Sequence, residues 1–64
     1  MKIEPGMLLM TPRRRPTMVI EGFTCSDGEA WWVLMDREGK FNAKERWLRN
    51  QIRGGILEVI NEAR

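Results

Sequence analysis

Histidine is absent from this 64-residue sequence, and cysteine occurs only once, as Cys25. The missing histidine removes the commonest general base and the commonest metal ligand in proteins. A single cysteine can neither form a disulfide within the chain nor assemble a zinc cluster. The carboxylates show no spacing that is typical of an acid and base pair. The sequence therefore predicts a protein that is not an enzyme and that needs no metal or other cofactor.

A long apolar run is also absent. No stretch approaches the roughly 20 apolar residues of a membrane-spanning helix. The chain opens with Met1 to Pro5, without the charged start and apolar core of a secretion signal. Together with the lone cysteine, these features predict a soluble protein of the reducing cytoplasm that has no membrane partner.

What is present is the composition of a globular protein, with 42% hydrophobic and 31% charged residues. A chain of 64 residues allows one small domain, 1–64, whose single core leaves a thin margin of stability. The net charge is only +2, so the distribution of charge says more than its total. Arg13, Arg14 and Arg15 lie together between two prolines, and a second basic group lies between Lys44 and Arg53.

The longest apolar run, Ala30 to Asp36, predicts the central strand of a small sheet. Side chains alternate across a strand, so Trp31 shares one face with Val33 and Met35 while Trp32 shares the other with Leu34. A domain this small cannot bury both tryptophans on opposite faces. One of them is therefore expected to cover the core, and the other is a candidate stacking platform. The sequence does not say which is exposed.

Three further strands are expected around this one, at residues 7–11, 17–24 and 40–41. Within the second, Gly22 marks a bulge or a bend. The turn signals Asp27-Gly28 and Glu38-Gly39 connect the strands as hairpins.

A helix is predicted over residues 43–53. Asn42 to Glu45 has the form of a capping box, and Gly54-Gly55 supplies the stop. The helical repeat divides the side chains between two sides. The side expected to dock on the sheet carries Trp47, Leu48, Gln51 and Ile52. The side expected to face solvent carries Arg46, Arg49 and Arg53.

Residues 56–60 are ambiguous, because their apolar positions fit both a strand and a helical stripe. We predict a strand that pairs with the first strand and closes the sheet, since a helix would leave an exposed edge.

These expectations add up to a mostly β fold with one short helix. The order of elements resembles the small SH3-like barrels, in particular the KOW-like and Tudor-like modules. The resembling segments are Pro5 to Leu9, Thr17 to Gly22, Trp32 to Asp36 with Gly39-Lys40, and Gly55 to Ile60. The resemblance implies a five-stranded barrel that binds nucleic acid, peptides or protein subunits, and it carries over no binding residues. The alternative is an α+β fold, with a sheet of three or four strands and two C-terminal helices.

Two functions remain open. The preferred one is a small regulatory protein that binds DNA or RNA, in which the arginines neutralise phosphates and a tryptophan stacks on a base. Its candidate residues are Arg13, Arg14, Arg15, Trp32, Arg46, Arg49 and Arg53. The other is a protein-interaction module, either an adaptor, an inhibitor or a self-associating protein. Arginine clusters on one face would favour nucleic acid, and clusters on opposite sides would favour a protein partner.

Overall fold

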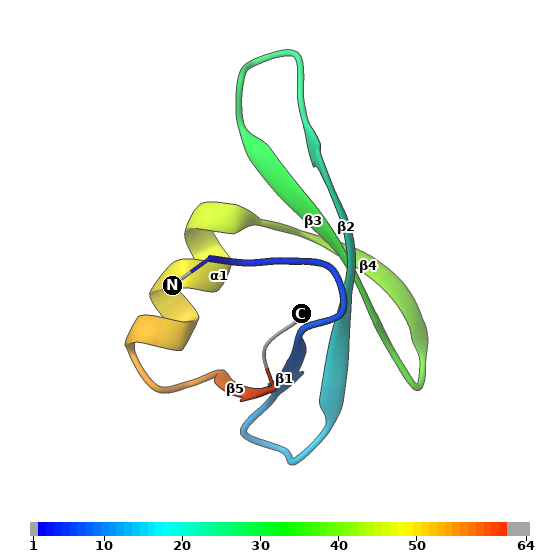
Figure 1. Ribbon diagram of the computed structural model, residues 1–64, viewed down its shortest axis with the longest axis vertical. Helices are drawn as coiled ribbons and strands as arrows, with labels where there is room; N and C mark the ends of the chain where they lie inside the picture. The colour runs from blue at the N-terminus through cyan, green and yellow to red at the C-terminus, as the bar shows by residue number, and fades with distance from the viewer. Residues whose placement is uncertain (1, 62–64) are drawn as a thin grey trace.

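A computed structural model describes residues 2–61 as one antiparallel sheet of five strands with a single helix (Figure 1). The strand order across the sheet is β4-β3-β2-β1-β5. The elements are β1 (Leu8–Met10), β2 (Pro16–Thr24), β3 (Ala30–Asp36), β4 (Gly39–Lys44), α1 (Glu45–Arg53) and β5 (Glu58–Asn61). The predicted mostly β fold with one short helix is confirmed. Among the described residues no ladder joins β4 to β5, so the sheet is open and has these two strands as its edges.

The end of α1 follows from the glycine pair. Gly55 adopts a left-handed conformation with a φ of 80°, and its N–H donates to the carbonyl of Ile52. The N–H of Ile56 donates to the carbonyl of Gln51, which completes a Schellman motif. The chain then reverses into β5, which pairs antiparallel with β1. The predicted strand in this segment is confirmed and its helical alternative is wrong, although β5 does not close the sheet.

The start of α1 differs from the prediction. Asn42 does not cap the helix, because residues 42–44 continue β4 opposite β3. Lys44 occupies the N-cap position with extended backbone and makes no capping bond through its side chain. Pairing along the whole of β3 buries Ala43, which is 8% exposed. Long-range strand pairing and burial therefore outweigh a local capping signal.

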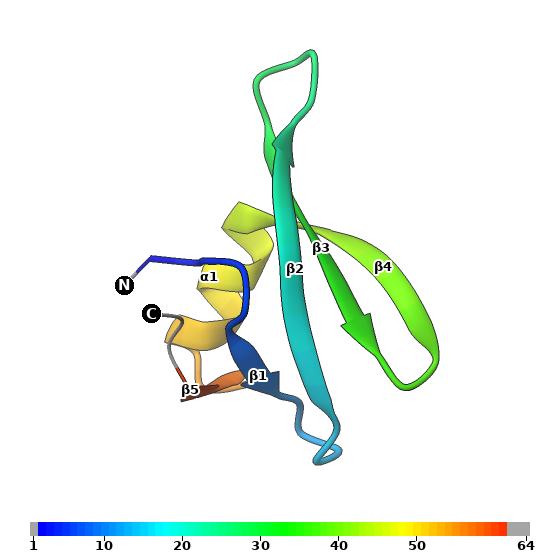
Figure 2. The same ribbon diagram turned by 45° about the vertical axis from the view of Figure 1, so that its right-hand side comes forward.

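One face of the sheet, here called the covered face, packs against α1 and the N-terminal segment (Figures 1 and 2). Leu48 of α1 meets Leu34 of β3 and Val19 of β2 in the core. The buried apolar residues are Ile3, Met7, Leu9, Val19, Leu34, Ala43, Leu48 and Leu57. Within residues 2–61, no helix has both the length and the apolar character needed to cross a bilayer.

A β-bulge interrupts the pairing of β2 with β3. Val19 lies opposite Leu34 and Glu21 lies opposite Val33, so Ile20 is the extra residue. The irregularity predicted at Gly22 therefore lies two residues earlier. Its effect is to place Gly22, and not Glu21, on the covered face opposite Trp32.

Candidate interaction surface

The opposite side of the sheet, here called the open face, is built by three strands whose side chains line up in rows. Alternation places Trp31, Val33 and Met35 of β3 on this face, because Trp32 and Leu34 belong to the covered face. The register then fixes their neighbours on β2 and β4. The rows are Phe23-Trp31-Lys44, Glu21-Val33-Asn42 and Met18-Met35-Lys40.

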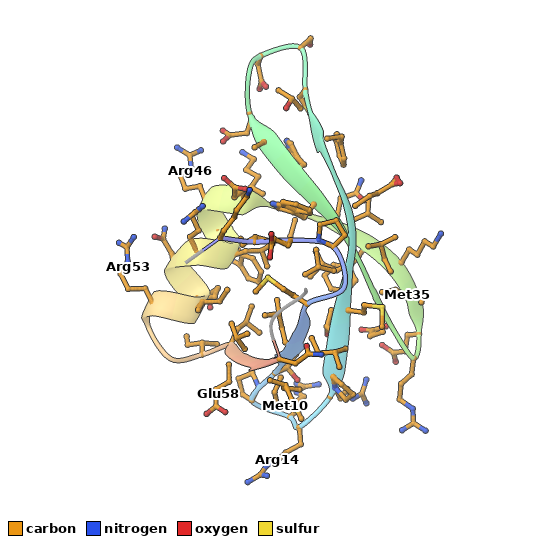
Figure 3. The ribbon with its side chains drawn as sticks, viewed as in Figure 1. Met10, Arg14, Met35, Arg46, Arg53 and Glu58 are labelled. Atoms are coloured by element: carbon orange, nitrogen blue, oxygen red, sulfur yellow. The ribbon has the colours of Figure 1, made fainter. Side chains whose placement is uncertain are left out.

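The apolar side chains of the open face remain accessible to solvent. Met18 is 38% exposed, while Phe23 and Met35 are each 40% exposed. Trp31 and Val33 between them are half-buried. Figure 3 shows Met35 on the side of the sheet away from α1. The open face thus carries an apolar strip along β3 that extends to Met18 and Phe23 of β2, with the exposed Glu21 between these two and two lysines on β4 at its border.

Trp31 is the tryptophan that the open face offers. Its ring stacks beside Phe23, with centroids 6.3 Å apart and planes inclined by 12°. The Nζ atom of Lys44 lies 5.6 Å from the centroid of Trp31, within the range of a cation–π interaction. Contacts on both sides hold the indole in place, as a binding surface requires.

Trp32, the predicted stacking residue, lies instead on the covered face. It is half-buried and packs against the core. Its Nε1–H donates to Oε1 of Glu45 at 2.9 Å. Glu45 of the helix thus satisfies the one polar atom of the indole. Trp32 therefore covers the core and is not an exposed surface on which a base could stack.

The arginine loop between β1 and β2 is a compact turn. The N–H of Arg14 donates to the carbonyl of Thr11, and the N–H of Arg15 donates to Oγ1 of Thr11. Arg14 has a φ of 63°, a left-handed conformation. Arg15 forms an ion pair with Glu38 at 3.4 Å, while Arg13 and Arg14 are exposed and form no ion pair with the described residues.

The helical arginines are also partly engaged. Arg46 pairs with Glu29 at 2.9 Å, and Arg49 pairs with Glu45 at 3.5 Å. Figure 3 shows Arg46 and Arg53 projecting from α1, whereas Arg14 points away from the lower end of the molecule. The structure does not bring the two arginine groups together into one track.

A cleft of about 440 Å³ lies beside the arginine loop and next to the start of β5. Its walls include Met10, Arg14 and Glu58, all labelled in Figure 3. The carboxylate of Glu58 would repel a phosphate there. Because Arg14 lines the same cleft, its walls carry one charge of each sign and offer no net attraction for a phosphate.

A second cleft, of about 340 Å³, surrounds the free edge of β4 and is here called the edge cleft. Trp31 and Lys44 approach it from the open face, while Phe41 and Trp47 approach it from the covered face. Phe41 is 42% exposed and Trp47 is 49% exposed. Trp47, predicted to dock on the sheet, lies beside Phe41 and Ala43 of β4 with about half of its surface exposed, while Leu48 fills the core position.

Sequence reasoning missed Phe41 and Trp47 as surface residues. The available signal was the length of β4, since a strand that continues to Lys44 carries Phe41 opposite Leu34 and brings Trp47 beside the same edge. Within residues 2–61 no three His, Cys, Asp or Glu side chains gather as metal ligands. Comparison of the chain with protein-family models, with curated proteins and with solved structures gave no match.

Proposed function

We propose that this protein is a non-enzymatic interaction module that binds another protein through the open face of its sheet. The observation that carries the proposal is the apolar strip formed by Met18, Phe23, Trp31, Val33 and Met35. Adjacent apolar side chains that stay exposed on a small domain are typical of protein interfaces. Methionines suit this role because their flexible side chains adapt to a partner's surface.

Nucleic acid is the second candidate, supported by the exposed Arg13, Arg14 and Arg53. It ranks below a protein partner for two reasons. The loop arginines and the helical arginines point in different directions, and Arg15, Arg46 and Arg49 already pair with carboxylates. A polyanion would have to displace these pairs or use only the remaining arginines.

We also propose that the fold is a small SH3-like barrel in which the two edge strands, β4 and β5, do not pair with each other. The support is the strand order β4-β3-β2-β1-β5 and the position of the helix just before the last strand. A cytoplasmic location stays a prediction that rests on the lone Cys25.

Affinity purification with matched baits tests the protein-binding proposal. The baits are the wild-type chain, the open-face variant Met18→Gln/Met35→Gln, and the control variant Ile56→Gln. Ile56 is 52% exposed but follows α1 at the other edge of the sheet, so the control also removes an exposed apolar side chain. We expect wild type and control to retain a common set of proteins, and the open-face variant to lose it.

Equal retention by all the baits would contradict the proposal. The nucleic-acid alternative is measured separately by mobility shift with DNA and RNA at several salt concentrations. If Arg13, Arg14 and Arg53 neutralise phosphates, log affinity should fall against log salt with a slope near −2 to −3. Such a slope, combined with unchanged protein retention in the open-face variant, would reverse the ranking.

A further inference from the structure

The edge strand β4 has no neighbour on its outer side within the described residues. It is six residues long, whereas the other edge strand, β5, has four. Figure 2 shows the hairpin end of β4 at the right-hand margin of the sheet, while its other end leads into α1. An edge of this length is a template on which another strand can pair.

The register identifies the backbone groups that this edge offers. Asp36 and Gly39 close a two-residue turn, and such a turn closes on a hydrogen-bonded pair. Hydrogen-bonded and non-bonded pairs alternate along an antiparallel ladder, so Lys40, Asn42 and Lys44 direct their backbone groups away from β3. The carbonyl of Lys44 starts the helix. The backbone N–H and C=O groups of Lys40 and Asn42 form no hydrogen bond with the described residues.

The edge cleft flanks the same strand with apolar surface on both sides. Phe41 and Ala43 point to the covered face, where Trp47 forms the outer wall, and Trp31 lies on the open face. A strand added to β4 would therefore place every second side chain against Phe41 and Trp47. Those positions favour apolar residues.

The alternate positions of an added strand meet a different surface. On the open face β4 presents Lys40, Asn42 and Lys44, and the strand contains no acidic residue. Side chains of a partner at these positions are favoured when they are acidic. Antiparallel pairing with a second copy of β4 centred on Asn42 is disfavoured, because it would set Lys40 against Lys44 of the other chain.

We infer that β4 and the edge cleft bind an extended segment of another protein by strand addition, and that acidic and apolar residues alternate along this segment. The inference rests on the proposed function and gives it a partner class and a binding mode. Hydrogen bonds to Lys40 and Asn42 hold the segment, the lysines select its acidic residues, and the edge cleft receives its apolar ones.

The probe is a seven-residue peptide of alternating glutamate and valine with blocked ends, added to the full-length ¹⁵N-labelled chain. We expect saturable shifts of the Lys40 and Asn42 amide signals and slower hydrogen exchange at both. A second pair of peptides carries N-methyl groups, either on all glutamate amides or on all valine amides. Only one set of amides can face β4, so one methylated peptide should bind about tenfold more weakly or not at all, while the other keeps its affinity.

The charge requirement is tested with Lys40→Glu and with the control Arg13→Glu, which makes the same charge change on the exposed loop. We expect about tenfold weaker peptide binding for Lys40→Glu and unchanged binding for Arg13→Glu. Equal loss in both variants would indicate unspecific attraction and would overturn the inference.

Other occupants of the edge give distinct results. Equal binding of both methylated peptides, or no binding of the probe, overturns strand addition. Protection of Lys40 and Asn42 without peptide, together with a doubled mass in solution, identifies a second copy. Single-stranded DNA that shifts these amides identifies nucleic acid, and each of these results also overturns the inference. The proposed function is judged independently, by loss of protein retention in Met18→Gln/Met35→Gln.

Discussion

Substitution of Gly22 by alanine tests the packing of the sheet against Trp32. A β-carbon at this position would lie 3.0, 3.1 and 3.2 Å from three carbon atoms of the Trp32 ring. The ring cannot swing away freely, because it packs against the core and its Nε1–H donates to Glu45. The added methyl group must therefore push the ring or spread the two strands.

Two effects oppose each other in this variant. Alanine in a strand is favoured over glycine by about 0.5–1 kcal/mol, because glycine loses more conformational freedom on folding. An extra methyl group forced into close-packed surroundings costs about 1–3 kcal/mol. The ring contacts should dominate, so we expect Gly22→Ala to lower the free energy of unfolding by about 1–2 kcal/mol. For a chain of this size, each kcal/mol lowers the melting temperature by about 4–8 °C.

Urea unfolding followed by circular dichroism measures this loss, and a double-mutant cycle assigns its cause. Trp32→Phe removes the outer ring atoms that crowd the new methyl group. In the Trp32→Phe background, Gly22→Ala should be neutral or slightly stabilising. A Gly22→Ala variant as stable as the wild type, or an equal loss in both backgrounds, would refute the reasoning.

Two further substitutions probe α1 and its end. Leu48 is 1% exposed, so Leu48→Ala should lower the free energy of unfolding by about 2–5 kcal/mol. So small a domain should then lose its cooperative thermal transition. Trp47→Ala should keep that transition. Two similarly stable variants would contradict the assigned core. Gly55→Ala should cost about 1 kcal/mol through its positive φ alone, since no atom lies within 4 Å of the new β-carbon. In thermal denaturation, Gly55→Asn should be more stable than Gly55→Ala, because asparagine tolerates a positive φ better than alanine does. Equal stability of the two variants would contradict strain at this φ as the cause.

The parts of the fold that the sequence predicts well depend on local signals. The apolar run from Ala30 to Asp36 has the same bounds as β3. Gly54-Gly55 ends the helix where a left-handed residue is needed. Both features arise from neighbouring residues, so no knowledge of distant contacts is required.

The errors arise where a distant contact decides between local alternatives. Asn42 fits a capping box, but its pairing with Val33 across the sheet keeps it in β4. Trp47 then lies in the first turn of the shorter helix, beside the β4 edge, and is 49% exposed. Alternation alone separates Trp31 from Trp32, yet only the position of α1 shows that Trp32 lies on the covered face.

The candidate site was predictable in kind but not in place. The two apolar faces of β3 and the need for one to stay open follow from alternation and chain length. The arginine clusters are visible in the sequence, but their partners Glu29, Glu38 and Glu45 are found only by folding. Phe41 gains its role because β4 becomes an edge strand, which is a property of strand order and not of its neighbours in the chain.

The hairpin formed by β2 and β3 offers the chain a place to change length. Beyond the bulge at Ile20, β2 pairs only with β3, and the loop from Cys25 to Glu29 lies outside both strands. If two residues were added to β2 and two to β3 beside this loop, the existing side chains would keep their positions on the two faces of the sheet. The open face can thus be extended past Phe23 without disturbing the buried core, although the ion pair between Glu29 and Arg46 would be lost.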